Sequence, residues 1–138
     1  MTNVASTLAL THAGVLAMLQ AAVACAEEMG QPQCIVVVDA SGETLGEIRM
    51  SGAKYLSRRS ARTKARTAAS IGAPSDAIPE AVRPAIAAAT QNAVTGLGGG
   101  LPIRMGGTLV GGIGVGSGTQ EQDIEVGRAA LAAIGAEI

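Results

Sequence analysis

Hydrophobic residues recur along the chain at two periods, and the first of these is helical. Between Thr11 and Met29 the apolar positions are spaced by three and four residues, and Gly30 and Pro32 follow. The Thr11 hydroxyl can accept a hydrogen bond from an N–H of the first turn, while glycine and proline end helices. The pattern therefore predicts a helix from about Thr11 to Met29.

The next two segments have the pattern of strands. A continuous β-branched run over residues 34–39 is typical of a strand buried on both faces. Residues 40–43 have the composition of a turn, and residues 44–50 then mix apolar and charged positions. We expect 44–50 to pair antiparallel with 34–39.

A second strand pair is predicted in the glycine-rich part of the chain. Residues 101–105 (LPIRM) are apolar except for Arg104, residues 108–115 (TLVGGIGV) combine β-branched residues with glycine, and Gly106 and Gly107 lie between the two runs. Both glycines can adopt the positive φ angles of a two-residue hairpin turn. The sequence therefore predicts a β-hairpin.

Three further helices are predicted at residues 56–71, 80–92 and 120–134, and 94–100 is expected to be a loop or a short edge strand. Hairpins rather than crossovers connect the strands, which favours an antiparallel sheet of four or five strands with helices packed on it. We expect an α+β fold and a single domain over residues 1–138.

Composition alters this picture in one respect, the size of the core. The chain is 48% hydrophobic, but it has no Phe or Trp, Tyr55 is its single aromatic residue, and nineteen residues are glycine. Small side chains bury little area each. We therefore expect self-association into a homo-oligomer, which buries further surface.

Charge and cysteine content exclude several classes of partner. A net charge of −1 gives no reason to bind nucleic acid or an anionic membrane, and no apolar run is long enough to span a bilayer. The N-terminus lacks the basic region of a signal peptide. Cys25 and Cys34 form no CxxC pair and are expected to be small core residues. We expect a cytoplasmic protein without nucleic-acid or membrane partners.

The loop before the last predicted helix is a candidate binding site. A glycine-rich loop ahead of a helix N-terminus exposes backbone N–H groups beside a partial positive charge, which suits a carboxylate, a phosphate or a polar ligand edge. Two cations elsewhere in the chain could hold a ligand carboxylate. The candidate ligand-binding residues are Lys64, Arg104, Gly116, Ser117, Gly118 and Gln122.

Seven of the ten basic residues lie between Arg49 and Arg66. Arg58, Arg62 and Arg66 recur every four residues and form one stripe of the predicted helix 56–71. The stripe is either a solvated face paired with acidic neighbours, which we favour, or a clamp for ligand carboxylates. The sequence does not decide which basic residues of 54–66 face a ligand.

Three residues could transfer protons, and each also has a structural interpretation. His12 is the only histidine, so a catalytic triad or a multi-histidine metal site within one chain is excluded. It is a surface or interface histidine, an axial ligand to haem iron, or a lone general base. Asp39 precedes Ser41 and Gly42, as in an Asx-type turn. Asp123 lies in a first helical turn, where the helix dipole stabilises a carboxylate.

Several short segments together resemble a known family. They are Leu10-Thr11, Val36–Gly42 (VVVDASG), Arg49–Ala53 (RMSGA), Lys64–Ala69 (KARTAA), Gly99–Ile103 (GGLPI), Val110–Gly118 (VGGIGVGSG) and Gln122-Asp123. In this order and at this spacing they resemble the haem-binding-protein-S and GlcG-like family, which also occurs as the C-terminal domain of PduO-type proteins. The resemblance covers nearly the whole chain.

The resemblance implies a profilin-like layered fold, with an antiparallel sheet of about five strands and helices on both faces. It also implies assembly into hexamers or octamers, and an association with haem binding, haem degradation, redox-linked regulation or glycolate utilisation. Adenosyltransferase labels in the family come from a fusion partner, and we do not extend them to this chain. A helix-one histidine has been proposed as an iron ligand in related domains, and His12 falls in that helix.

Two departures separate this chain from the family. The RMDGA-like segment of the family has Ser51 in place of its acidic residue, and aromatic residues that usually wall a porphyrin are lacking.

Three hypotheses remain open. The first is an oligomeric haem or tetrapyrrole binder with His12 as axial ligand and basic residues at the propionates. The second is an enzyme for a small carboxylate-bearing metabolite, held by Lys64, Arg104 and loop 116–118, with His12, Asp39 or Asp123 moving protons. The third is a structural subunit without a ligand.

Overall fold

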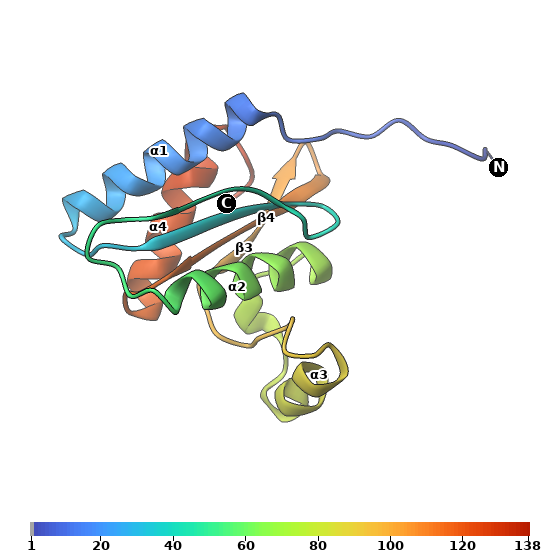
Figure 1. Cartoon of the computed structure of the whole chain (residues 1–138). Helices are drawn as coiled ribbons and strands as arrows, with labels where there is room; N and C mark the ends of the chain where they lie inside the picture. The colour runs from blue at the N-terminus through green and yellow to red at the C-terminus, as the bar shows by residue number, and fades with distance from the viewer. Residues whose placement is uncertain (1) are drawn as a thin grey trace.

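The computed structural model describes residues 2–138 and contains one antiparallel sheet with helices on both faces (Figure 1). The strands are β1 (Cys34–Asp39), β2 (Thr44–Arg49), β3 (Gly100–Met105) and β4 (Thr108–Gly116), in the order β2-β1-β4-β3. The helices are α1 (His12–Glu28), α2 (Ser57–Ile71), α3 (Arg83–Ala89) and α4 (Gln120–Ala133), with 3₁₀ turns η1 (Ser75–Ala77) and η2 (Glu80–Val82).

The predicted α+β architecture is confirmed, with four strands in the described part of the chain. β1 pairs antiparallel with both β2 and β4, and Ile35 lies opposite Ile48 on one side and Val115 on the other. The predicted hairpin is also confirmed, since Gly106 and Gly107 have φ angles of 56° and 83°. Residues 94–99 form a loop before β3 rather than an edge strand.

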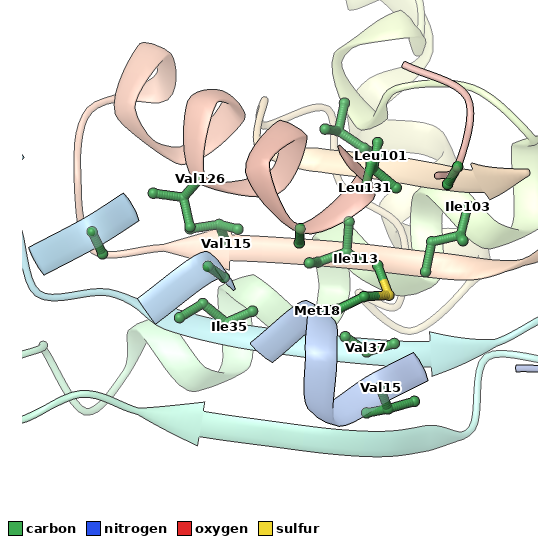
Figure 2. Close-up of a cluster of buried hydrophobic side chains, with 14 of the residues drawn as sticks. Val15, Met18, Ile35, Val37, Leu101, Ile103, Ile113, Val115, Val126 and Leu131 are labelled. Atoms are coloured by element: carbon green, nitrogen blue, oxygen red, sulfur yellow. The ribbon is translucent and has the colours of Figure 1, made fainter. Parts of the chain in front are cut away.

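The main hydrophobic core lies between the sheet and the pair of helices α1 and α4. Met18 of α1 and Ile35 and Ile113 of the central strands are fully buried there, and Val126 and Leu131 of α4 close the same cluster (Figure 2). Thr11 is the N-cap of α1, because its hydroxyl accepts a hydrogen bond from Gly14 N at 3.2 Å. The first predicted helix is therefore confirmed.

The opposite face of the sheet is covered by α2, which contacts the backbone of β4 directly. A methyl group on Gly114 would collide with the carbonyl oxygen of Ala61, and one on Gly112 would collide with that of Ala65. Alanine on the helix and glycine on the strand thus allow an unusually close approach. This packing fixes the height of α2 above the sheet.

The helix expected over 80–92 is shorter than predicted. The α-helical part covers only Arg83–Ala89, and η2 precedes it. Pro84 has no N–H and is tolerated only in the first helical turn, so the α-helix cannot begin much earlier than Arg83. Gln91 and Asn92 then adopt positive φ angles of 54° and 63°, which ends the helix.

The segment before α1 runs away from the body of the molecule (Figure 1). Val4 and Leu8 in this segment are largely exposed. Within residues 2–138, no helix combines the length and the apolar character needed to cross a membrane.

Candidate functional site

A buried ion pair joins α2 to α4 at the end of β4. Lys64 Nζ lies 3.0 Å from Asp123 Oδ2 and also donates to the carbonyl oxygen of Val115 at 2.8 Å. The side chains of Lys64 and Asp123 are only 7% and 3% exposed. The second carboxylate oxygen of Asp123 accepts from Gly118 N at 3.1 Å. Two predicted site residues from distant parts of the chain are therefore in direct contact.

The position of Lys64 on α2 explains why its charge is buried. Lys64 lies three residues after Ala61 and four before Ala68, so it shares the alanine face that packs on β4. The arginines at 58, 62 and 66 lie on an exposed face. The sequence alone did not separate Lys64 from the other basic residues of 54–66, although its register with the alanine face could have done so.

Glycine at position 99 allows the backbone to pass close to this ion pair. A methyl group on Gly99 would lie 3.1 Å from Lys64 Nζ and 3.0 Å from Asp123 Cβ, and the φ angle of Gly99 is 117°. Gly116 is the last residue of β4, where it pairs with Cys34. The segment that leads into β3 therefore lies directly over the ion pair.

The sequence predicted free backbone N–H groups in the loop 116–118 and the first turn of α4, but the structure shows several of them bonded within the protein. Gln122 and Thr119 form a capping box, in which each side chain bonds to the backbone N–H of the other residue. Gly118 N is taken by Asp123. The first turn of α4 thus satisfies these donors itself, and the Gln122 amide caps the helix.

Ser117 lies in this loop with strained backbone geometry. Its φ angle of 104° is rare for a residue with a side chain. Its hydroxyl oxygen accepts from Lys54 N at 3.0 Å, and its carbonyl oxygen lies 3.3 Å from the side-chain nitrogen of Gln31. These contacts hold the loop against the segments that flank β1 and α2.

A pocket of about 290 Å³ lies beside the ion pair. Its polar lining includes Lys54, Ser57, Ser60, Lys64, Gln120 and Asp123. Of the predicted ligand-binding residues, Lys64, Ser117 and Gly118 line this pocket, whereas Arg104 does not.

Arg104 has a structural contact elsewhere. Its guanidinium donates to the carbonyl oxygen of Gly72 at 2.9 Å, at the C-terminal end of α2. Gly72 has a φ angle of 64°, as is usual for the residue after a helix. The structure therefore places Arg104 at a helix end and apart from Lys64.

Asp39 caps the β1–β2 turn, as an Asx-type turn predicts. Its Oδ1 accepts from the hydroxyl and N–H of Ser41, at 2.7 and 2.9 Å, and from Glu43 N at 3.1 Å. The hydroxyl of Ser41 and these N–H groups hold the pKa of the Asp39 carboxyl below its usual value. The contacts of Asp39 are those of a turn residue.

His12 is the first residue of α1 and is exposed. Its neighbours Thr11 and Gly14 line a shallow pocket with Met105 and Val110, beside the β3–β4 turn. That turn is at the opposite end of β4 from Gly116 and the ion pair. His12 therefore lies at a site separate from the one that Lys64 and Asp123 share.

Two of the three arginines in the stripe, Arg58 and Arg62, are paired with an acidic neighbour, as the favoured interpretation expected. Arg58 and Arg62 lie 2.9 and 3.5 Å from the two carboxylate oxygens of Glu47 on β2. The hydrogen bond from Arg58 holds the pKa of the Glu47 carboxyl below its usual value. Tyr55, the single aromatic residue, is 68% exposed and is not a core residue.

One buried polar group was not singled out from the sequence. The Gln33 side chain is fully buried, and neither its amide oxygen nor its amide nitrogen has a hydrogen-bond partner among the described residues. A methyl group on Gly118 would lie 2.7 Å from the Gln33 amide nitrogen. Gln33 lies between Pro32 and the first residue of β1, and no sequence pattern marks such a position.

Both cysteines are free, and Cys34 is fully buried. Burial raises the pKa of both thiols above the usual value. Within residues 2–138, no three His, Cys, Asp or Glu side chains are grouped so that they could hold a metal ion.

Comparison with known proteins gives this architecture a family. The model of the haem-degrading HbpS-like proteins matches residues 10–132. The corrinoid adenosyltransferase PduO of Citrobacter freundii is 33% identical over 122 residues, which are 85% of this chain but only 36% of that protein. The chain therefore spans about a third of the length of this curated relative.

Solved structures extend the similarity to the whole fold. The Klebsiella pneumoniae protein ORFY superposes with a TM-score of 0.93 at 29% identity and covers 100% of this chain and 99% of its own. A structure of a PduOC:heme complex superposes with a TM-score of 0.87 at 30% identity, over 94% and 98% of the two chains. The chain belongs to the HbpS-like family, and the resemblance seen in the sequence is confirmed.

Proposed function

We propose that this protein is an oligomeric haem- or tetrapyrrole-binding protein, with His12 as the axial ligand. Family membership supports the class of ligand, and a related domain of similar length has a structure in complex with haem. The observation that carries the proposal for this chain is the exposed His12 at the first position of α1. A neutral imidazole nitrogen is a common ligand for haem iron.

The surroundings of His12 suit an apolar macrocycle on one side. Leu16 lies one helical turn after His12 and is 63% exposed, and Leu8 before the helix is 55% exposed. Leu16, on the same helix face as His12, would provide apolar contact beside the iron. The residues present at α1 thus fit a haem-type ligand. Such a ligand would supply metal-centred redox chemistry. Within residues 2–138, no group of three or more His, Cys, Asp or Glu side chains could hold a metal ion by itself.

One chain offers such a ligand only a single wall and a single histidine. Haem sites usually bury most of the ligand surface, so a second copy would have to cover the exposed side. A second copy would also bring its own His12. The proposed site therefore lies between subunits, and assembly into hexamers or octamers belongs to the same proposal.

Exposed apolar side chains elsewhere support self-association. β2 is an edge strand of the sheet, and its Leu45 and Ile48 are 42% and 39% exposed. Unpaired edges and exposed apolar patches are typical of interaction surfaces. A groove of about 610 Å³ runs between β2 and the C-terminal half of α1, beside Val23, Ile48 and Met50.

This groove gives the proposal a competing location. Val23 lies eleven residues after His12, about 16 Å along α1, and His12 does not line the groove. Met50, whose thioether sulfur could also bind iron, does line it. The two locations can be separated by mutation.

The test is a haemin titration followed by absorbance on protein of known oligomeric state. We expect a saturating Soret shift near one haem per subunit or per subunit pair, lost in His12→Ala and retained in Gln20→Ala, an exposed position on the same helix. If His12→Ala retains the shift while Met50→Leu loses it, the ligand lies in the groove and the assignment of His12 is wrong. Loss of assembly in His12→Ala would identify an interface histidine instead.

Haem degradation or a redox-linked role would require that the protein binds haem first. The family description supports testing it. Haem-loaded protein incubated with a reductant in air should lose its Soret band and release iron faster than free haem does. An unchanged rate would leave binding as the function.

A further inference from the structure

The pocket beside Lys64 and Asp123 is separate from the proposed haem site and differs from it in chemistry. It opens where the N-terminal parts of α2 and α4 meet the end of β4, and most of its lining is polar. Leu97 is the one large apolar side chain that lines it. Its volume of about 290 Å³ is at the lower limit for drug-sized ligands. A small polar molecule fits this pocket, and a tetrapyrrole does not.

The Lys64 ammonium at the pocket has one N–H donor without an acceptor in the described part of the chain. An ammonium group has three N–H donors. The Val115 carbonyl and the Asp123 carboxylate accept two of them, and the third has no hydrogen-bond acceptor among residues 2–138. Because the Lys64 side chain is only 7% exposed, this donor has little access to bulk water. A ligand oxygen in the pocket would satisfy it, and a charge-assisted bond of this kind is strong.

The charges around the pocket favour an anion. Both oxygens of Asp123 are already engaged, one by Lys64 and one by Gly118 N, so its negative charge is compensated within the protein. Lys54 adds an exposed ammonium to the lining, 3.5 Å from the carbonyl oxygen of Ser117. Asp76 does not line the pocket, and its carboxylate lies 3.5 Å from the side-chain nitrogen of Gln120, which does. The lining side chains therefore carry two positive charges and one negative charge.

Neutral donors and acceptors complete the lining. The Ser117 hydroxyl oxygen accepts from Lys54 N, which leaves its O–H available as a donor. The Ser57 hydroxyl and the Gln120 amide also face the pocket. Such groups recognise hydroxyl and carboxylate oxygens, whereas a purely apolar ligand would leave them unpaired.

An orphaned buried amide lies immediately behind this wall. The Gln33 amide, which has no partner, packs against Gly118, a residue of the pocket lining. A methyl group at Gly118 would collide with the amide groups of Gln33 and Gln122, so the bare Gly118 backbone packs directly against the Gln33 amide. Unsatisfied buried polar groups are costly, and they recur where an additional polar partner binds.

From these observations we propose that the pocket binds a small hydroxycarboxylate. Its carboxylate would lie between the ammonium groups of Lys64 and Lys54, and its hydroxyl would contact Ser117. The proposal does not depend on haem, because His12 lies at the other end of β4. Failure of haem binding and failure of carboxylate binding are therefore distinguishable.

The experiment is an NMR titration of ¹⁵N-labelled protein with lactate, and with propane-1,2-diol as its neutral analogue. We expect saturable shifts with lactate at the amides of Gly98, Ser117 and Gly118, with a Kd of about 1 mM or tighter, and none with the diol. His12→Ala should leave the titration unchanged. Equal responses to acid and diol, or no saturable shift with lactate, would overturn the proposal.

Two variants sharpen the test. Lys54→Gln should weaken lactate binding about tenfold, as expected for loss of a charge-assisted contact. Arg59→Gln, which removes an exposed cation of α2 that does not line the pocket, should bind like the unchanged protein. Equal weakening by both variants would show a general surface-charge effect and contradict the site.

Ser117→Gly provides a variant that should not lose stability. Glycine accepts the φ angle of 104° more readily than serine, so this change relieves strain while removing the hydroxyl. We expect weaker lactate binding together with an unchanged or higher melting temperature. Full retention of affinity would show that the hydroxyl makes no contact with the ligand.

Discussion

Lys64 and Asp123 are fifty-nine residues apart in sequence, yet their charged groups lie 3.0 Å apart in the buried junction of α2, α4 and β4. Each charge has further partners, the carbonyl of Val115 for the lysine and Gly118 N for the aspartate. The pair thus connects the two helices that lie on opposite faces of the sheet.

Breaking this pair should be costly. Lys64→Met leaves the Asp123 charge buried without its cation, and we expect a loss of about 3–5 kcal/mol in the free energy of unfolding. The double variant Lys64→Met/Asp123→Asn removes both charges and keeps an acceptor for Gly118 N, so most of the loss should be recovered. Urea unfolding measures both. Equal stability of the single and double variants would contradict a coupled pair.

Glycine positions should respond with opposite signs. Gly114→Ala places a methyl group against the carbonyl oxygen of Ala61 and should destabilise by about 1–3 kcal/mol or more. Gly14→Ala in α1 meets only Thr11 Oγ1 at 3.8 Å and should stabilise by up to about 1 kcal/mol, because alanine favours helices. Melting temperatures of the two variants test this directly. A neutral Gly114→Ala would show that α2 can move away from β4.

The turn aspartate should make stability depend on pH. The folded pKa of Asp39 lies below its unfolded value near 4, so the carboxylate contributes stability that is fully present above the unfolded pKa. This contribution is lost as the pH falls through the folded pKa. The stability difference between the native chain and Asp39→Asn should be constant at neutral pH and shrink in acid. Urea midpoints across this range provide the measurement, and a difference independent of pH would contradict it.

The two thiols should differ in reactivity. Cys34 is fully buried, and its sulfur donates to the carbonyl oxygen of Lys54, whereas Cys25 is partly exposed. Burial raises the pKa of both, so both should react more slowly than an exposed thiol, and Cys34 should be the slower. Alkylation followed by mass spectrometry should show one early and one late modification. Only the late one should remain in Cys25→Ser.

The elements could be predicted because their signals are local. The cap at Thr11 and the Gly106-Gly107 turn depend on residues within one turn of the chain, and both are confirmed. The extent of α3 was the exception. Pro84 marked the limit of its α-helical part, and only the structure shows that the turn before Pro84 is 3₁₀ rather than α.

The site could be predicted only in part, because it depends on tertiary register. Lys64 and the loop 116–118 were singled out, but not that Asp123 would neutralise the lysine or that Gln122 would cap its own helix. Arg104 was grouped with them on charge alone, but in the structure its guanidinium donates to the carbonyl oxygen of Gly72 instead. Which cation reaches which loop depends on how closely α2 packs on β4, and no local pattern contains that distance.

The direct backbone packing of α2 on β4 limits which substitutions this protein can accept. At Gly112 and Gly114 there is no side chain to trim or enlarge by small steps, since the smallest addition already meets a carbonyl of the helix. A substitution at Gly112 or Gly114 would be accommodated only if α2 moved away from β4. We therefore expect substitutions to be tolerated more readily at the pocket rim and the outer surfaces than at Gly112 and Gly114.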